Sequence, residues 1–327
     1  MTLNLLFVGD VMLGRFVNEL LQGVSPAHPW RDTRKVFLRA DWRACNLECA
    51  ISDRGNPWDA TPKAFHFRSD ARNAAVLGSA HIDVVSLANN HSLDFGYEAM
   101  FDTLRILDSA GIAHAGAGAN FHAASAMTVS SVGGMRIGFI AFTDNQPEWE
   151  ATADRPGVLY TPIDADDERA RRLLRLIKRA RKSVDLLVVS AHWGPNWGYV
   201  PPVEHPRFAR QLIDHGAAIV FGHSGHVFRG IEIYKQRPIL HCTGDFIDDY
   251  AVDELERNDQ SFMFLIHAQA NSIRRIRLYP TLIDTCQARR ARGRQADTIA
   301  AKMKELCDGF GTRSVWDRRE RVLEIRL

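Results

Sequence analysis

The sequence predicts an α/β fold, and three observations carry that prediction. Short apolar runs recur from residue 3 to about residue 221 of the 327-residue chain. Helical patterns, with apolar residues three and four positions apart, separate these runs. After residue 222 the pattern changes to closely spaced strand candidates joined by short polar turns. Strands that alternate with helices are typical of a sheet covered by helices on both faces.

Five apolar runs have the length and composition of buried strands. They cover residues 3–8, 82–88, 136–142, 186–191 and 217–221. Between them, three segments have their apolar side chains on one helical face. These expected helices cover residues 97–110, 166–182 and 206–215.

The rest of the chain is rich in strand candidates, which we expect to form a second, β-rich layer. They cover residues 228–234, 238–243, 261–268 and 272–278. The arginine-rich segment 289–294 is expected to be a solvated connector, with nucleic-acid contact only a minor alternative because the segment is short and has no interleaved aromatic residues. A helix at residues 296–307 and a strand at residues 322–327 follow it.

Composition excludes several classes of protein. Lys and Arg number 41 against 39 Asp and Glu, so no global charge favours nucleic acid or an anionic membrane as a partner. Five cysteines without a CxxC pair argue against a disulfide framework or a zinc ribbon. No segment reaches the ~20 apolar residues of a membrane-spanning helix, and the N-terminus has no leader pattern. We therefore expect a cytoplasmic globular protein without a membrane anchor.

Carboxylate, amide and imidazole side chains follow the apolar runs. Each one alone has an ordinary explanation as a turn residue, a helix cap or a hydrogen-bonded histidine. The carboxyl ends of strands border the ligand crevice of an α/β sheet, so we expect these side chains to lie together. Their mixed oxygen and nitrogen donors are those of manganese, iron or zinc hydrolytic centres. The expected metal ligands are Asp10, Glu48, Asn90, His192, His223 and His226.

Two local patterns sharpen this hypothesis. His223 and His226 share a glycine-containing turn after a strand, which allows both imidazoles to face one cavity, although His226 can instead cap the next segment. His91 is followed three residues later by Asp94, the arrangement expected of a catalytic histidine oriented by a carboxylate.

These residues lie in motifs that resemble those of the CapA family, which is associated with poly-γ-glutamate capsule synthesis. The resemblance covers about residues 3–250. The motifs are Gly9-Asp10-Val-Met-Leu-Gly-Arg15, Asn46-Leu-Glu48, Asn89-Asn90-His91-Ser-Leu-Asp94-Phe-Gly96, His192-Trp193-Gly194 and Gly222-His223-Ser-Gly-His226-Val.

CapA proteins are similar to calcineurin-like metallophosphoesterases, and this resemblance implies a four-layer α/β/β/α sandwich. It implies that the helix-rich and strand-rich halves are the two sheets of one domain over residues 1–283, completed by a helix and a strand in residues 284–327. Carried over, Asp10 is the first metal-binding carboxylate, Glu48 the bridging one, and His91 the catalytic histidine.

The chain also departs from the resemblance. Met12 stands where phosphoesterases have a histidine, and Glu48 stands for the usual aspartate, so one or two divalent ions of Mn, Zn or Fe are expected. Residues 244–250 replace the Gly-Asn-Phe of many CapA proteins, and we expect no N-terminal membrane anchor of the kind that capsule-type members have. These departures indicate a subgroup.

Five further residues are expected around the metal. Arg15, Arg68 and Trp193 are expected to contact an anionic peptide or small-molecule substrate. A surface role for Arg15, an edge strand at Arg68 and simple packing of Trp193 are open alternatives. Asn46 and Asp245 are expected to orient the ligands from behind.

Three functions remain open on this basis. The first is a metal-dependent hydrolase or transferase acting on a γ-glutamyl substrate, and the second is a metallophosphoesterase acting on a small phosphoester. The third is a non-catalytic, metal-containing subunit of a polymer synthesis complex. The His91 and Asp94 pair argues against the third, because a purely structural metal site needs no such pair.

Overall fold

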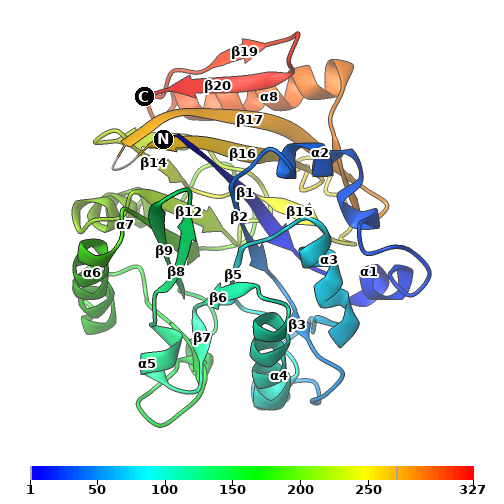
Figure 1. The fold of residues 1–327 in the computed structure, drawn as a ribbon, viewed down its shortest axis with the longest axis vertical. Coiled ribbons are helices and arrows are strands. Elements are labelled where there is room, and N and C mark those ends of the chain that lie inside the picture. Colours follow the sequence, from blue (N-terminus) through cyan, green and yellow to red (C-terminus); the bar gives the residue numbers. More distant parts are fainter. Residues whose placement is uncertain (1, 270–271) are drawn as a thin grey trace.

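Two β-sheets packed face to face form the centre of the protein, and helices cover their outer faces (Figure 1). The structure is a computed structural model and describes residues 2–269 and 272–327. The order of layers is helices, ten-stranded sheet, six-stranded sheet and helices. The predicted α/β sandwich is therefore confirmed.

The ten-stranded sheet contains the first strand of the chain near its middle. Its main path is β19 (Val315–Asp317), β20 (Val322–Arg326), β17 (Ser272–Asp284), β16 (Gln260–Gln269), β1 (Leu3–Val11), β2 (Trp42–Leu47), β5 (Val84–Ser86) and β6 (Ala113–Ala115). Two further strands join it, β15 (Asp245–Ile247) beside β1 and β18 (Gln287–Arg290) beside β17. Strands β1, β2, β5 and β6 run parallel, so their carboxyl ends lie at one edge.

The six-stranded sheet has a parallel centre as well. Its order is β13 (Ile231–Tyr234), β14 (Arg237–Leu240), β12 (Ile219–His223), β11 (Leu186–His192), β9 (Met135–Thr143) and β8 (Thr128–Val132). Two small pairs accompany the sheets, β3 (Ala50–Ile51) with β4 (Arg68–Ser69) and β7 (Ala117–Gly118) with β10 (Gly157–Val158).

The helices are divided between the two outer faces. The large sheet is covered by α1 (Arg15–Leu20), α2 (Arg34–Phe37), α3 (Ala74–Ser79) and α4 (Gly96–Ser109). The small sheet is covered by α6 (Glu168–Ala180) and α7 (Glu204–Asp214). The remaining helical segments are α5 (Phe121–Ala124), α8 (Gly293–Asp308) and the 3₁₀ turns η1 (His28–Thr33), η2 (Ala71–Asn73), η3 (Pro147–Trp149) and η4 (Arg181–Ser183).

Strand β1 illustrates why the central strands are continuously apolar. Leu6 and Val8 point towards the helices, whereas Leu5 and Phe7 point towards the small sheet. A strand buried on both faces has no solvent side, so it loses the alternation of polar and apolar residues that a surface strand shows. The apolar runs in the sequence are these strands.

The structure corrects the predicted division of the two layers. The strand-rich half is not a layer of its own: β13 and β14 extend the small sheet, whereas β16 and β17 pair into the large sheet beside β1. The prediction of a connector at residues 289–294 is also wrong. The first two arginines of this segment belong to β18, and its last two residues begin α8. The backbone of β18 pairs with β17, and the arginine-rich composition of this segment gives no sign of that pairing.

The C-terminal segment packs into the same core as the rest of the chain. Strand β20 pairs with β17, and α8 buries Ile299 and Met303 among residues of both sheets. The five cysteines are free and buried. Among the described residues, no helix is long and apolar enough to cross a membrane.

The packing between the sheets allows a test of the fold. Phe139 on β9 is fully buried between the two sheets. We expect Phe139→Ala to lower the free energy of unfolding by about 3–5 kcal/mol, because it leaves a cavity that neighbouring strands cannot fill. Urea unfolding measures this loss, and the exposed Leu255→Ala is the control. A loss equal to that of the control would mean that Phe139 does not pack between the sheets.

Candidate metal centre

The two sheets meet at an edge where the carboxyl ends of five parallel strands carry polar side chains. Asp10 lies near the end of β1, Glu48 directly follows β2, and Asn90 follows β5. From the small sheet, His192 and His223 are the last residues of β11 and β12, and they are partners in the strand register. The loop after β12 adds His226.

Two groups of donor atoms are formed by these residues, and Asp10 belongs to both. The first group contains Asp10, His192 and His223, and the second contains Asp10, Glu48, His226 and Asp245. Within each group the donor atoms lie within 4.8 Å of one another. The side-chain oxygen of Asn90 lies 2.9 Å from His192 Nε2, beside the first group. The structure thus brings all six expected ligands to one place, and Asp10 rather than Glu48 is the carboxylate common to both groups.

The carboxylates of this cluster lack counter-charges. Both oxygens of Glu48 and one oxygen each of Asp245 and Asp248 are buried without a hydrogen-bond partner in the described part of the chain. No described Lys or Arg forms an ion pair with these groups or with Asp10. Burial, followed by repulsion from neighbouring carboxylates, raises the pKa of Glu48 and Asp245 well above the usual range.

Such a cluster fits a divalent cation. Buried charges are stable only when they are paired or coordinate a metal, and a cation would satisfy the oxygens that have no partner. The first group offers one oxygen and two nitrogen donors, whereas the second offers three carboxylates and one imidazole. Mixed N and O donors suit Zn, Fe or Mn, and an oxygen-rich set suits Mn in particular.

The imidazoles are held as neutral groups. Burial lowers the pKa of His223 to about 3 and that of His192 well below its ordinary value. His223 Nε2 lies 2.7 Å from the Ser190 hydroxyl, which leaves Nδ1 to face His192 Nδ1 at 2.8 Å. His226 Nδ1 donates to Asp245 at 2.9 Å. Partners that fix one ring nitrogen leave the other free to coordinate.

A chain of side-chain amides links the donors of the large sheet. Asn46 donates to Asp10 Oδ1 at 2.8 Å, and Asn89 donates to the Asn46 oxygen at 3.0 Å. The Asn89 oxygen in turn accepts from the backbone of His91 at 2.9 Å. The expected orienting role of Asn46 agrees with this chain, which runs across β1, β2 and the loop after β5.

The backbone around the cluster is tightly constrained. A side chain at Gly9 would place its Cβ 1.7 Å from the carbonyl oxygen of Gly244, so only glycine allows β1 to approach the segment before β15 this closely. Ser224 and His226 have φ values of 101° and 57°, which L-residues rarely adopt. Strain of this kind persists where surrounding contacts hold a functional loop in place.

His91 lies beside the donor groups but belongs to neither. Its Nδ1 is 2.6 Å from Asp94 Oδ2, and its Nε2 is 3.9 Å from Glu48 Oε1. The ring stacks on Phe67 with 4.1 Å between centroids. Burial lowers the pKa of His91 to about 4 despite the carboxylate partner, so the ring is neutral. A neutral ring that donates Nδ1–H to Asp94 presents an unprotonated Nε2 to the cluster.

Lys63 is a functional residue that the sequence interpretation missed. Its ammonium lies 3.3 Å from Asp94 Oδ1 and donates to the backbone oxygen of Asn90 at 2.6 Å. It therefore fixes both the carboxylate behind His91 and the loop that carries Asn90. A lysine in a proline-rich loop has no local signal for this role, because its partners lie 27 and 31 residues further along the chain.

A pocket of about 560 Å³ opens over the cluster. His91, Asn90 and His226 form part of its wall nearest the donors. Its outer wall includes Arg15, Lys63, Phe65, Phe67, Trp197 and Tyr250. The pocket therefore joins the donor groups to solvent through a rim of aromatic and basic side chains.

Arg15 occupies the rim in a fixed position. Its guanidinium pairs with both oxygens of Asp249, at 3.1 and 3.2 Å, and lies within 6 Å of the ring centroids of Phe65, Phe67 and Tyr250. The side chain remains 39% exposed, so part of its donor capacity faces the pocket.

Two expected substrate contacts are corrected by the structure. Arg68 points away from the pocket, lies over the Phe95 ring and donates to the carbonyls of Arg54 and Gly55. Trp193 is fully buried, packs against Phe142 and donates to the carbonyl of His241. Asp245 was expected only to orient the metal ligands. It accepts a hydrogen bond from His226 and also belongs to the second group of donor atoms.

The architecture defines the class as a two-sheet α/β sandwich, with a candidate metal site where the sheets meet. A crystal structure of a hypothetical protein from Thermus thermophilus has a similar fold, with a TM-score of 0.52 and 16% identity over 85% of this chain and 98% of that chain.

Sequence comparisons identify the family. The model described as bacterial capsule synthesis protein PGA_cap matches residues 4–250. A Mycobacterium tuberculosis protein named as a probable polyglutamine synthesis accessory protein is 33% identical over 98% of this chain and 95% of its own length. The capsule biosynthesis protein CapA of Bacillus anthracis is 26% identical over 99% of this chain and 78% of its own. The chain belongs to the CapA family of bacterial capsule synthesis proteins, as predicted from its motifs.

The donor geometry makes a prediction that separates ligands from neighbours. His223→Ala should lower the amount of divalent metal that copurifies with the protein, because it removes one of three donors of the first group. His91→Ala should retain the metal, since His91 belongs to neither group. Elemental analysis of protein purified without chelators measures both, and equal loss in the two variants would make His91 a ligand.

Proposed function

We propose that this protein is a metal-dependent hydrolase that cleaves γ-glutamyl amide bonds in an anionic peptide or polymer. The observation that carries the proposal is the position of the His91–Asp94 pair, in the same open pocket as two donor groups that share Asp10. A closed structural metal site would need neither the pocket nor the pair. This argues against a non-catalytic subunit.

The donors would hold one or two ions of Mn, Zn or Fe. A bound ion of this kind lowers the pKa of a water ligand towards neutrality and polarises a carbonyl or phosphoryl oxygen. Asn46, Ser190 and Asp245 hold their partners among the donor residues in fixed orientations. The chain thus supplies a rigid coordination shell before any substrate arrives.

His91 would move the proton of the reaction. Its unprotonated Nε2 faces the cluster, and Asp94 holds the opposite ring nitrogen at 2.6 Å. Nε2 takes a proton from the attacking water and returns it to the leaving amine nitrogen, so that the amide carbon gains oxygen as the C–N bond breaks. Lys63 holds Asp94 in place during both transfers.

Charge balance favours a neutral amide over a phosphoester as the reacting group. Asp10, Glu48, Asp245 and Asp248 place four carboxylates at the cluster, which two divalent cations would only neutralise. A phosphoester is negatively charged and binds best where the site has excess positive charge. This site would have no such excess, so it would not stabilise a bound phosphoester. The fold resemblance keeps phosphoester hydrolysis as the second candidate.

Arg15 would bind a carboxylate of the substrate outside the reacting centre. It lines the same pocket as His91, and its planar donors match a carboxylate. The names of relatives support a polymeric substrate of this kind: the PGA biosynthesis protein CapA of Bacillus subtilis is 29% identical over 84% of this chain and 70% of its own, and the mycobacterial protein is named for polyglutamine synthesis.

Parallel assays on a γ-glutamyl peptide and a phosphodiester test the proposal. Metal-loaded protein should release free amine from the peptide, and His91→Ala should lower kcat by about 10²–10⁴-fold, because the proton transfer is lost. Metal removal by a chelator should abolish the activity, and readdition of Mn or Zn should restore it. Turnover of the phosphodiester alone would replace the amide hydrolase with the second candidate.

Arg15 and Arg68 provide a matched pair for substrate recognition. We expect Arg15→Met to raise KM for an anionic γ-glutamyl peptide by roughly 10–100-fold with little change in kcat, because one charged hydrogen-bonding partner is lost. Arg68→Met removes the same charge outside the pocket and should leave KM unchanged. Equal effects of the two substitutions would assign the change to overall charge rather than to the pocket.

A further inference from the structure

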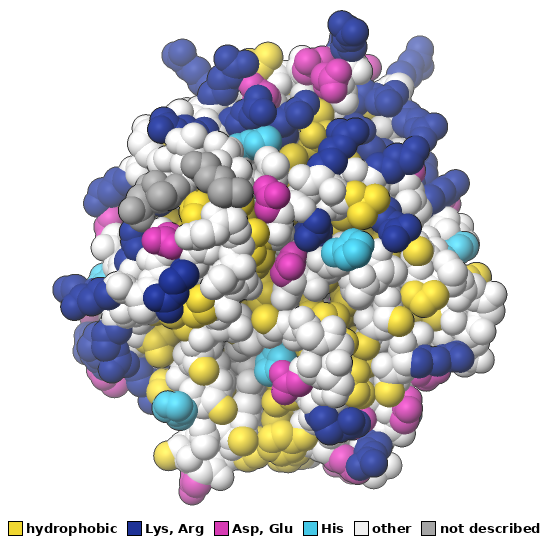
Figure 2. Space-filling model, viewed as in Figure 1, with side chains coloured by type: hydrophobic (Ala, Val, Ile, Leu, Met, Phe, Trp, Pro, Cys, Tyr) yellow, Lys and Arg dark blue, Asp and Glu magenta, His cyan; other side chains and the backbone are white. Residues whose placement is uncertain are grey.

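Positive charge is concentrated at the C-terminal end of the chain. Residues 272–327 contain 14 Lys and Arg against 7 Asp and Glu, whereas the remainder contains 27 against 32. In space these residues form β17, β18, α8, β19 and β20. Figure 2 shows Lys and Arg side chains gathered along the margin over these elements. The near-neutral overall charge therefore hides a basic region.

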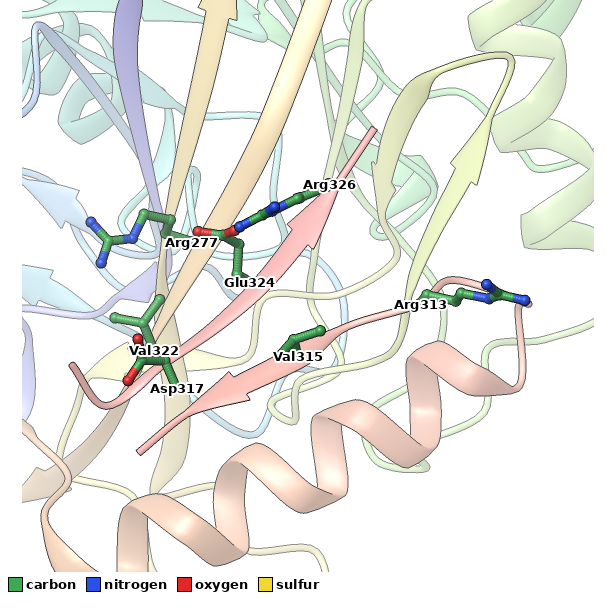
Figure 3. A pocket seen from close by; sticks show the side chains of 7 residues that line it. All are labelled: Arg277, Arg313, Val315, Asp317, Val322, Glu324 and Arg326. Atoms are coloured by element: carbon green, nitrogen blue, oxygen red, sulfur yellow. The ribbon is translucent and has the colours of Figure 1, made fainter. Parts of the chain in front are cut away.

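A groove of about 530 Å³ lies within this region, and we call it the basic groove (Figure 3). It is lined by Arg277 of β17, Arg326 of β20 and Arg313 ahead of β19, together with Glu324 and Asp317. Arg277 and Glu324 are partners across the two strands. None of these residues belongs to the metal centre or its pocket.

The arginines of the basic groove are only partly neutralised. Glu324 accepts from Arg326 at 2.6 Å and also faces Arg275 at 3.7 Å, so one carboxylate serves two cations. The ion pair of Arg277 with Glu320 is long, at 3.9 Å. Arg313 has no ion pair or hydrogen bond within residues 2–269 and 272–327. Guanidinium donors are therefore free to bind an external anion.

We propose that the basic groove binds a stretch of an anionic polyamide chain at a distance from the metal centre. Arginines would pair with the carboxylates of the polymer, which the planar guanidinium matches with two parallel hydrogen bonds. Asp317 and Glu324 would accept from its amide N–H groups. The proposal rests on the proposed function for the identity of the polymer, a γ-linked polyglutamate.

The composition of the groove favours a polyamide over a nucleic acid. No aromatic side chain lines it, whereas single-stranded nucleic acids are typically held by stacking on aromatic rings. Asp317 and Glu324 would repel phosphates and find no N–H donor on a phosphodiester backbone. A polymer with both carboxylates and amides uses both kinds of side chain.

The groove and the metal centre are separated both along and across the large sheet. Arg277 pairs with Leu265 of β16 and so lies level with Leu6 of β1, four residues before Asp10, and Glu324 lies one strand beyond Arg277. Four residues along a strand and three spacings between strands together correspond to roughly 20 Å. A long polymer can reach both places at once, which raises its effective concentration at the metal centre, whereas a dipeptide cannot.

Binding of fluorescently labelled γ-linked polyglutamate tests the proposal, in a His91→Ala background so that the polymer is not consumed. Arg313→Glu combined with Arg326→Glu should weaken binding at physiological ionic strength by about tenfold or more, because two attractions become repulsions. The milder pair Arg313→Gln and Arg326→Gln should give a smaller loss in the same direction. Unchanged thermal unfolding of each variant shows that the fold is retained.

The matched control reverses two charges on the other side of the molecule. Lys178→Glu combined with Lys182→Glu changes the net charge equally on α6 and η4, at exposed positions. This control should change the affinity less than about twofold, since charges beyond a Debye length are screened. Equal losses in both double variants would overturn the proposal, because attraction would then be non-specific.

Two competitors decide the class of partner. A single-stranded oligonucleotide, or vesicles with anionic lipid, that binds more tightly than polyglutamate in an Arg313- and Arg326-dependent manner would overturn the polyamide assignment. In catalytically intact protein, the charge-reversed pair should raise KM for the polymer and leave turnover of a γ-glutamyl dipeptide unchanged. If the unsubstituted protein does not turn over the dipeptide, the proposed hydrolase function is contradicted. The proposal for the basic groove is not contradicted by that result, because polymer binding is measured separately.

Discussion

Four buried carboxylates that have no Lys or Arg partner in the described part of the chain are the constraint around which this protein is built. Asp10, Glu48, Asp245 and Asp248 are each almost fully inaccessible to water, and removing such charges from water is costly, whereas burying apolar groups is favourable. The close approach of β1 to the Gly244 segment and the strained turn at His226 both serve to bring these groups together. Features that destabilise the chain locally are therefore concentrated at the candidate metal site.

The two sheets contribute different chemistry to this site. The large sheet provides the carboxylates and the amide of Asn90, whereas the small sheet and its loop provide His192, His223 and His226. Neither sheet alone holds a complete donor group, so the site exists only once the sheets have docked. Because the strands that meet there are distant in sequence, this assembly depends on the long-range contacts that form slowly in folding.

The sequence predicted the buried strands and the expected ligands because both leave local patterns. Partner choice between strands leaves none: β16 and Asp245 join β1 through contacts more than 200 residues apart, which no periodicity encodes. Trp193 and Arg68 were misplaced for a simpler reason. Each directly follows a residue that faces the site, His192 and Phe67, and successive strand side chains point to opposite faces. Applying that alternation would have placed both in their observed surroundings.

The amide chain from His91 through Asn89 and Asn46 to Asp10 has a consequence for the lifetime of the protein. Each amide has one possible orientation, because its oxygen must accept from one neighbour and its nitrogen must donate to the next. Hydrolysis of the Asn46 side chain during ageing would exchange that donor for a negative oxygen aimed at Asp10. A fifth charge would then enter a cluster that has no Lys or Arg partner among the described residues. Slow deamidation at this buried position would therefore disable the site chemically while the sheets around it stayed folded.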